Sequence, residues 1–304
     1  MNATIPDRGR LLTEQRNTAS RQIDVMPIEQ ALRIMADEDA KAVVAVRTAS
    51  ADLAPVIESV VAGMRRGGRL VYVGAGTSGR LGVLDASECP PTFFTEPRQV
   101  VGVIAGGDAA LRASSEAMED DPEAAAAELN RLGIGQADTV VGIAAGGTTP
   151  YVLGAFTRAK QCGAVTAMLC CVERAKPAAV DHLVILRVGP EVITGSTRMK
   201  AGTATKLALN MISTVTMVCL GKTWGNLMVD LRATNSKLRD RAIRILCDQC
   251  QMSRRNAELI LDQANGRVKL ALVMARLDLD AVAAQRRIDE HEGRLYPLLG
   301  APLE

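Results

Sequence analysis

The sequence has very few aromatic residues and no long apolar run. Aromatic residues make up 2% of the 304 residues, which leaves few rings on which single-stranded nucleic acid could stack. The apolar stretches fall well short of the ~20 residues that a membrane-spanning helix needs. The first 17 residues lack the apolar core of a secretory signal. We therefore expect no membrane association and no secretion.

The sequence also has no large excess of charge of one sign and no cluster of side chains that typically bind metals. The 36 Lys and Arg residues almost balance the 34 Asp and Glu residues, and no basic tract stands out, so we expect no nucleic-acid partner. Cys247 and Cys250 have no second pair and the chain has only two histidines, so we expect no metal. Seven scattered cysteines, an odd number, indicate reduced thiols in a cytoplasmic protein. Four of them stand in apolar runs and are expected in the core: Cys162, Cys170, Cys171 and Cys219.

What the sequence does have is a series of short apolar segments separated by helical ones. The five candidate strands are residues 69–73, 100–105, 139–145, 165–171 and 183–188. Nearly continuous apolar strands that alternate with helices indicate a parallel sheet covered on both faces. Further helices are expected over residues 27–46, 50–64 and 200–220. The fold class is therefore α/β with a five-stranded parallel sheet.

The pattern changes after the last of these helices. We predict a helical N-terminal segment over residues 1–58, an α/β domain over 59–222, a linker or helix over 223–239, and a small all-helical domain over 240–304. The last part contains no convincing strand. It reads as four short amphipathic helices over residues 241–249, 253–265, 267–275 and 279–291, with Ser253 as an N-cap.

Three glycine-rich turns with hydroxyl residues follow strands or precede helices of the α/β domain. Glycine lets a ligand approach the backbone closely, and a helix N-terminus offers free N–H groups and a partial positive charge. Together with Ser and Thr hydroxyls, such turns suit a phosphate. The candidate binding residues are Gly76, Thr77, Ser78, Gly79, Arg80, Gly146, Thr148, Thr149, Ser196, Thr197 and Lys200.

The first turn also has the spacing Gly74-x-Gly76-x-x-Gly79, which is the dinucleotide fingerprint. That fingerprint expects an acidic residue at the end of the next strand, and Asp108 comes too late for it. Two further Ser/Thr turns suit the single phosphate of a phosphosugar better. A purely structural set of turns is the remaining alternative.

General acid–base chemistry must fall on Glu, Asp, Lys or Tyr, because histidine is so scarce. Glu88 follows the first turn by about three helical turns, and Pro90 and Pro91 are expected to stop the helix behind it. Composition alone favours a solvated helix-end carboxylate there.

Glu119 lies near the end of the helix that is expected after the second strand. Its plain interpretation is a solvated acidic face, with Asp121 capping the next helix and Pro122 in that helix's first turn.

Long, specific motifs stand at residues 13–17, 23–24, 70–92, 195–204, 225–230 and 233–238. Together they resemble the N-acetylmuramic acid 6-phosphate etherases. This resemblance implies the sugar isomerase (SIS) superfamily, with a flavodoxin-like α/β sandwich. It also implies a cytoplasmic homodimer whose active sites lie at or near the subunit interface. By resemblance the substrate is N-acetylmuramic acid 6-phosphate, which water cleaves to N-acetylglucosamine 6-phosphate and D-lactate in cell-wall sugar recycling. No metal or organic cofactor is implied.

The resemblance assigns the two carboxylates to catalysis. Glu88 matches one acid/base residue of the family and Glu119 the other, with Glu116 as the fallback for Glu119. One group removes the C2 proton and the other protonates the departing lactate oxygen. We assign Glu88 as the acid and Glu119 as the base, and the reverse assignment stays open.

The chain departs from the family in the second turn. The family commonly has Ser and Arg where this chain has Gly146 and Thr148, so one charged donor is missing. Two other functions stay open: a phosphosugar-binding regulatory protein, like the glucokinase regulatory protein, and an aldose–ketose isomerase of the same fold. Only the etherase would release lactate.

Overall fold

The computed structural model of the chain describes residues 9–113, 118–231 and 236–303. The chain divides into two compact units. The first unit holds Met1–Ser87 and Arg98–Ser213, and the second holds Glu88–Pro97 and Thr214–Glu304.

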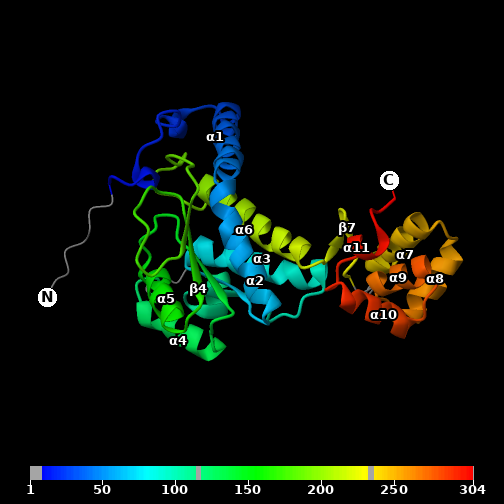
Figure 1. Cartoon of the computed structure of the whole chain (residues 1–304). Coiled ribbons are helices and arrows are strands. Elements are labelled where there is room, and N and C mark those ends of the chain that lie inside the picture. The colour runs from blue at the N-terminus through cyan, green and yellow to red at the C-terminus, as the bar shows by residue number, and fades with distance from the viewer. Residues whose placement is uncertain (1–8, 114–117, 232–235, 304) are drawn as a thin grey trace. The chain divides into compact units, whose positions relative to one another are not determined.

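A five-stranded parallel sheet forms the centre of the first unit (Figure 1). Its strands are β1 (Leu70–Gly74), β2 (Val100–Ile104), β3 (Thr139–Ile143), β4 (Val165–Cys170) and β5 (His182–Ile185). They lie in the order β2-β1-β3-β4-β5, which is the flavodoxin-like order. The predicted fold class and all five predicted strands are confirmed.

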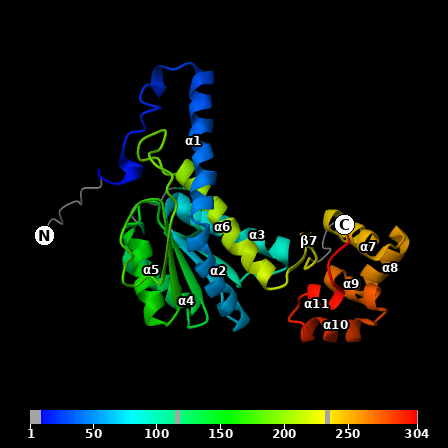
Figure 2. The same cartoon turned by 45° about the horizontal axis from the view of Figure 1, so that its top comes forward.

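Helices cover both faces of this sheet (Figure 2). They are α2 (Ser50–Arg65), α3 (Gly76–Phe93), α4 (Pro122–Leu132), α5 (Pro150–Gln161) and α6 (Lys200–Cys219). The helix before them, α1 (Ile28–Thr48), projects beyond the sheet (Figure 1). Val71 and Val73 of β1 pack with residues of α4 and α5 in one buried cluster. On the other face the Tyr72 hydroxyl donates to Asp85 of α3 at 2.8 Å. The alternation of neighbouring side chains along β1 therefore builds two cores.

The polar N-terminal segment is tied to the chain that precedes α6. It contains two short 3-10 helices, η1 (Leu12–Glu14) and η2 (Ile23–Val25). The Asn17 side chain donates to the Pro190 carbonyl at 3.0 Å, and the Gly195 amide donates to the Thr13 carbonyl at 3.0 Å. These bonds join segments that are far apart in the sequence.

One expectation about a helix end is wrong. Pro90 and Pro91 do not stop the helix after Glu88, since α3 runs on to Phe93. They lie in its last turn, and the helix ends only three residues beyond Pro90. After β2 the structure describes the 3-10 helix η3 (Gly107–Leu111), and then a helical residue at Met118 with Glu119 in the turn that directly follows it. Part of the helix expected here falls on residues 114–117, which lie outside the described residues.

The second unit is a helical bundle with one small hairpin. Its elements are β6 (Thr223–Trp224), β7 (Leu227–Met228), α7 (Ser236–Cys250), α8 (Arg254–Gln263), α9 (Val268–Leu277), α10 (Ala281–Glu290) and α11 (Tyr296–Leu299). Trp224 is buried in the core of the bundle, and its indole N–H donates to the Gly300 carbonyl at 2.8 Å. Ser253 caps α8 as predicted, by accepting from the Asn256 amide. The hairpin was not expected from the sequence.

The cysteines are free thiols, and three of them are buried: Cys89, Cys170 and Cys171. The expectation for Cys219 is wrong, because it is exposed at the end of α6. Within the described residues no helix is long and apolar enough to cross a membrane.

Candidate active site

The first glycine-rich turn joins β1 to α3 by very close packing. Gly76 has φ +51°, a left-handed value that favours glycine. A Cβ on Gly79 would lie 2.7 Å from the Gly74 oxygen, so only glycine lets the helix approach the strand here. Thr77 and Ser78 are half-buried in the first turn of α3. They lie beside backbone N–H groups that the helix itself cannot bond.

The turn before α6 lies beside this first turn. A Cβ built on Gly202, in the first turn of α6, would lie 3.5 Å from the Thr77 methyl carbon. Ser196 and Thr197 are half-buried just before this helix. The structure thus brings two of the three predicted turns together. Arg80 is directed elsewhere, because its Nε donates to the Leu111 carbonyl at 3.2 Å.

The N-terminus of α6 is occupied by a carboxylate of the protein. Glu191 is fully buried, and its side chain accepts from the amides of Lys200 at 3.2 Å and Ala201 at 2.9 Å. Burial raises the pKa of Glu191, and the two amide bonds oppose this. The expectation that this helix start offers free N–H groups is therefore wrong for Lys200 and Ala201.

The Lys200 side chain is buried in an ion pair. Its ammonium, 1% exposed, donates to Glu38 of α1, which also accepts from Lys41 at 2.6 Å. Burial opposes the charged form of Glu38, but the bonds from both lysines hold its pKa below the ordinary value. Lys200 and Glu38 border a cavity of about 640 Å³ that Arg16, Lys41 and Arg187 also line. Lys200 thus links the start of α6 to α1 through this ion pair.

The second turn, residues 146–149 before α5, is hydrogen-bonded to Glu119. The Thr149 hydroxyl donates to Glu119 Oε1 at 3.1 Å, and the Tyr151 amide donates to the Glu119 carbonyl at 3.0 Å. Asp121 caps α4 as predicted, by accepting from the amides of Glu123 and Ala124. Glu119 is therefore fixed between the turn before α5 and the start of α4, with its carboxylate half-buried.

Tyr151 is not a competing acid or base. Burial raises the pKa of its phenol to about 12, so the group stays neutral near pH 7.

Glu88 belongs to the second unit and is exposed on α3. The first unit holds Glu119, so neither unit by itself brings the two glutamates together. Glu116 lies outside the described residues.

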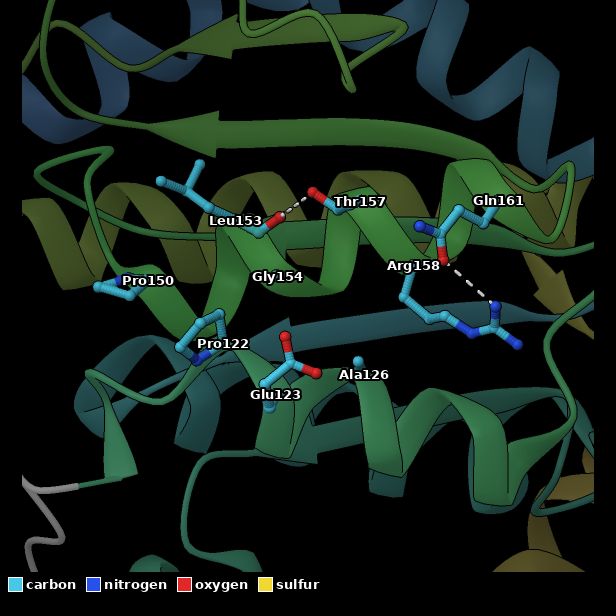
Figure 3. Close-up of a pocket in the computed structure, with 9 residues that line it drawn as sticks. All are labelled: Pro122, Glu123, Ala126, Pro150, Leu153, Gly154, Thr157, Arg158 and Gln161. Carbon is cyan, nitrogen blue, oxygen red and sulfur yellow. Dashed lines mark hydrogen bonds between the residues drawn. The ribbon is translucent and has the colours of Figure 1, made fainter.

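A cavity of about 440 Å³ lies between α4 and α5, and Figure 3 shows its lining. Pro122 and Glu123 of α4 and Arg158 of α5 point along its sides. None of the predicted site residues lines it. In the described part of the chain, no three His, Cys, Asp or Glu side chains are grouped as metal ligands.

Two buried acidic residues of the site were not found from the sequence. Glu191 lies nine residues before Lys200, too far along the chain to match a capping signal, so only the fold brings it to the start of α6. Glu38 lies four residues after Ile34 and four before Ala42, so it interrupts the apolar stripe of α1. That interruption was the one signal in the sequence.

Comparison with known proteins gives consistent relatives over most of the chain. The family model of the glucokinase regulatory protein N-terminal SIS domain matches residues 52–160. An N-acetylmuramic acid 6-phosphate etherase of Synechococcus sp. is 51% identical over 97% of this chain and 94% of its own length. The etherase of Crocosphaera subtropica is 50% identical over 98% of each chain. That of Cutibacterium acnes is 51% identical over 92% of this chain and 93% of its own.

Among solved structures, a phosphoheptose isomerase from Francisella tularensis is similar at a TM-score of 0.48 and 16% identity. It covers 64% of this chain and 100% of that one. This likeness is too distant to bear on function.

Proposed function

The chain belongs to the N-acetylmuramic acid 6-phosphate etherase family, and we propose that it cleaves the D-lactyl ether of N-acetylmuramic acid 6-phosphate with water. The products are N-acetylglucosamine 6-phosphate and D-lactate, which places the reaction in cell-wall amino sugar recycling. The observation that carries this proposal is the identity of about one half over nearly the whole of both chains.

In the proposed reaction the ether oxygen sits on C3, β to the aldehyde of the open-chain sugar. Glu119 takes the C2 proton, which that aldehyde acidifies. The C3–O bond breaks, and Glu88 gives a proton to the lactate oxygen because an alkoxide leaves poorly. Water then adds at C3 with the two roles reversed. The bond from Thr149 to Glu119 supports the assignment, since it holds one carboxylate at a candidate phosphate-binding turn.

The proposed binding groups are the three turns. Gly76, Thr77, Ser78 and Gly79 come from the first, and Ser196 and Thr197 from the turn beside it. Gly146, Thr148 and Thr149 come from the turn that holds Glu119. Arg80 and Lys200 complete the set. Their side chains donate to Leu111 and Glu38, so a supporting role fits both better than direct contact.

We further propose a cytoplasmic homodimer with its active sites at or near the subunit interface. The exposed position of Glu88 on α3 suits a carboxylate that acts in such an interface. Light scattering on the purified protein measures the mass directly, and a monomer at assay concentration would contradict this part of the proposal.

The activity test is lactate release. The purified protein is incubated with N-acetylmuramic acid 6-phosphate, and D-lactate is measured with a lactate dehydrogenase. Glu88→Gln and Glu119→Gln are each expected to lower kcat by roughly 10²–10⁴-fold, which is the usual worth of one positioned acid or base. Glu58→Gln on α2 and Glu123→Gln on α4 are matched controls, because both glutamates are exposed and outside the proposed site.

The match to the glucokinase regulatory protein domain keeps a binding function as the second candidate. A wild type that binds the sugar phosphate in calorimetry but releases no lactate would favour that candidate. Lactate release undiminished in either Gln variant would remove that glutamate from the mechanism.

A further inference from the structure

Arg174 lies directly over the turn that holds Glu119. It follows β4, which neighbours β3 in the sheet, so it reaches the carboxyl edge next to residues 146–149. A Cβ built on Gly147 would lie 2.7 Å from Arg174 Nη1 and 2.9 Å from its Cδ. Gly147 also has φ +70°. The glycine thus provides both the left-handed backbone and the space that the arginine occupies.

The Arg174 guanidinium has an N–H donor beside Gly147 from which no group of the described residues accepts a hydrogen bond. Among the described residues, Arg174 Nη1 is buried and has no hydrogen-bond partner. Its Nε donates only to the neighbouring Ala175 carbonyl, at 3.4 Å. The adjacent carboxylate, Glu173, is paired with Arg187 instead. A buried charged donor without an acceptor is costly, so this atom is suited to an anion that arrives with the ligand.

The turn itself has used several of its own donors. The Gly147 amide donates to the Ala144 carbonyl at 2.8 Å, and Pro150 has no N–H to offer. The Tyr151 amide and the Thr149 hydroxyl both donate to Glu119. A dianion at this turn therefore needs a charged side chain, and the chain has Thr148 where related enzymes commonly have arginine.

We propose that Arg174 binds the phosphate of the substrate and supplies the cation that position 148 lacks. The inference rests on the proposed function for the identity of the substrate. The guanidinium fork suits phosphate oxygens, and it reaches the turn from a different strand of the same sheet edge.

Steady-state kinetics test this assignment. Arg174→Ala is expected to raise KM for N-acetylmuramic acid 6-phosphate by roughly 10- to 100-fold, the worth of a hydrogen bond to a charged group. Its kcat should stay within about threefold, because the contact is made equally in the ground and transition states. Lys176→Ala is the matched control. It removes an exposed cation two residues away whose ammonium donates to the Asp181 carbonyl, and it should leave KM unchanged.

A rescue variant separates binding from a structural effect. Adding Thr148→Arg to Arg174→Ala returns a guanidinium to the same turn, and KM is expected to recover by at least threefold. If the double variant has a KM as high as that of Arg174→Ala, while its unfolding midpoint equals that of the wild type, then Arg174 does not supply the cation that position 148 lacks.

Product inhibition identifies the anion. Arg174→Ala should weaken inhibition by N-acetylglucosamine 6-phosphate about as much as it raises KM, and leave inhibition by D-lactate unchanged. Weakened inhibition by D-lactate alone would assign Arg174 to the carboxylate and contradict the proposal. If the wild type releases no lactate, the proposed function fails separately. Calorimetry with N-acetylglucosamine 6-phosphate then decides: weaker binding by the variant supports Arg174, and equal binding overturns it.

Discussion

The turn before α5 and the turn before α6 look alike in sequence, since each joins glycine to two hydroxyl residues ahead of a helix. Their surroundings differ. The start of α6 is closed by the buried carboxylate of Glu191 and braced by the pair of Lys200 with Glu38. The turn before α5 has Glu119 bound on one side and the unpaired Arg174 Nη1 on the other.

This difference distinguishes a turn that stabilises the fold from a turn that can bind an anion. A helix start that already holds a carboxylate of the protein has little left for a phosphate, because one anion repels the next. A buried cationic donor without a partner has the opposite preference. We therefore propose that the turn of residues 146–149 contributes more to ligand binding than the start of α6, where Glu191 and Lys200 stabilise the fold.

The largest expected effect is on the buried ion pair. Lys200→Met leaves the Glu38 carboxylate buried with Lys41 alone, and we expect the free energy of unfolding to fall by about 3–5 kcal/mol. The double variant Lys200→Met, Glu38→Leu should regain most of that loss, since both buried charges are gone. Urea denaturation measures both. If the free energy of unfolding of Lys200→Met lies within about 1 kcal/mol of the wild-type value, the ion pair does not stabilise the start of α6 and the contrast between the two turns is lost.

The next effect is at the α6 start itself. Glu191→Ala removes the acceptor of two buried amides, so we expect a loss of about 1–3 kcal/mol in the free energy of unfolding. The protein that remains folded should keep its KM, because the Glu191 carboxylate is buried and bound to two helix amides. A raised KM with unchanged stability would instead place Glu191 in the binding site.

Two glycines give a matched pair for the two turns. Gly147 and Gly195 have φ of +70° and +77°, so alanine at either position should cost about 1–2 kcal/mol of stability. Only Gly147→Ala also meets Arg174, and its Cβ would displace the guanidinium. Gly195→Ala meets the flexible end of Glu14 at 3.2 Å. We expect KM to rise several-fold in the first variant alone, and equal KM values would contradict the proposed role of Arg174.

The two buried carboxylates of the α6 support should respond to pH in opposite directions. The pKa of Glu191 is raised on folding, so its contribution is full at low pH and is lost as pH rises through the raised pKa. The pKa of Glu38 is lowered, so its contribution is present at neutral pH and is lost as pH falls. As pH rises from about 4.5 to about 7, stability relative to the wild type should improve for Glu191→Gln, and as pH falls from about 4.5 to about 3 it should improve for Glu38→Gln. The urea midpoints of the wild type and both variants, measured across these pH values, test this prediction. Midpoints that change with pH in parallel for all three proteins would refute it.

The smallest effect is expected at Thr148. Its side chain is exposed, so Thr148→Ala should change stability by no more than about 0.5 kcal/mol. Loss of one hydroxyl donor should raise KM by a few-fold at most. A rise as large as that expected for Arg174→Ala would make Thr148, and not the arginine, the principal donor of this turn.

Much of the architecture was predictable because it depends on local patterns. The five strands follow from short apolar runs, and Asp121 and Ser253 cap their helices as their positions suggested. Pro90 and Pro91 were misjudged, because α3 continues through both prolines and ends at Phe93. The hairpin of Thr223–Trp224 and Leu227–Met228 is too short to leave a periodic signal.

The sequence by itself determined the order of strands and helices, the three turns and the family, since these rest on residues close together in the chain or on long matching motifs. Only the tertiary structure decided which of the similar turns is already filled. Glu191 reaches the α6 amides, Lys200 reaches Glu38, and Arg174 covers Gly147. These contacts join separate elements, and the packing of helices on the sheet sets their distances.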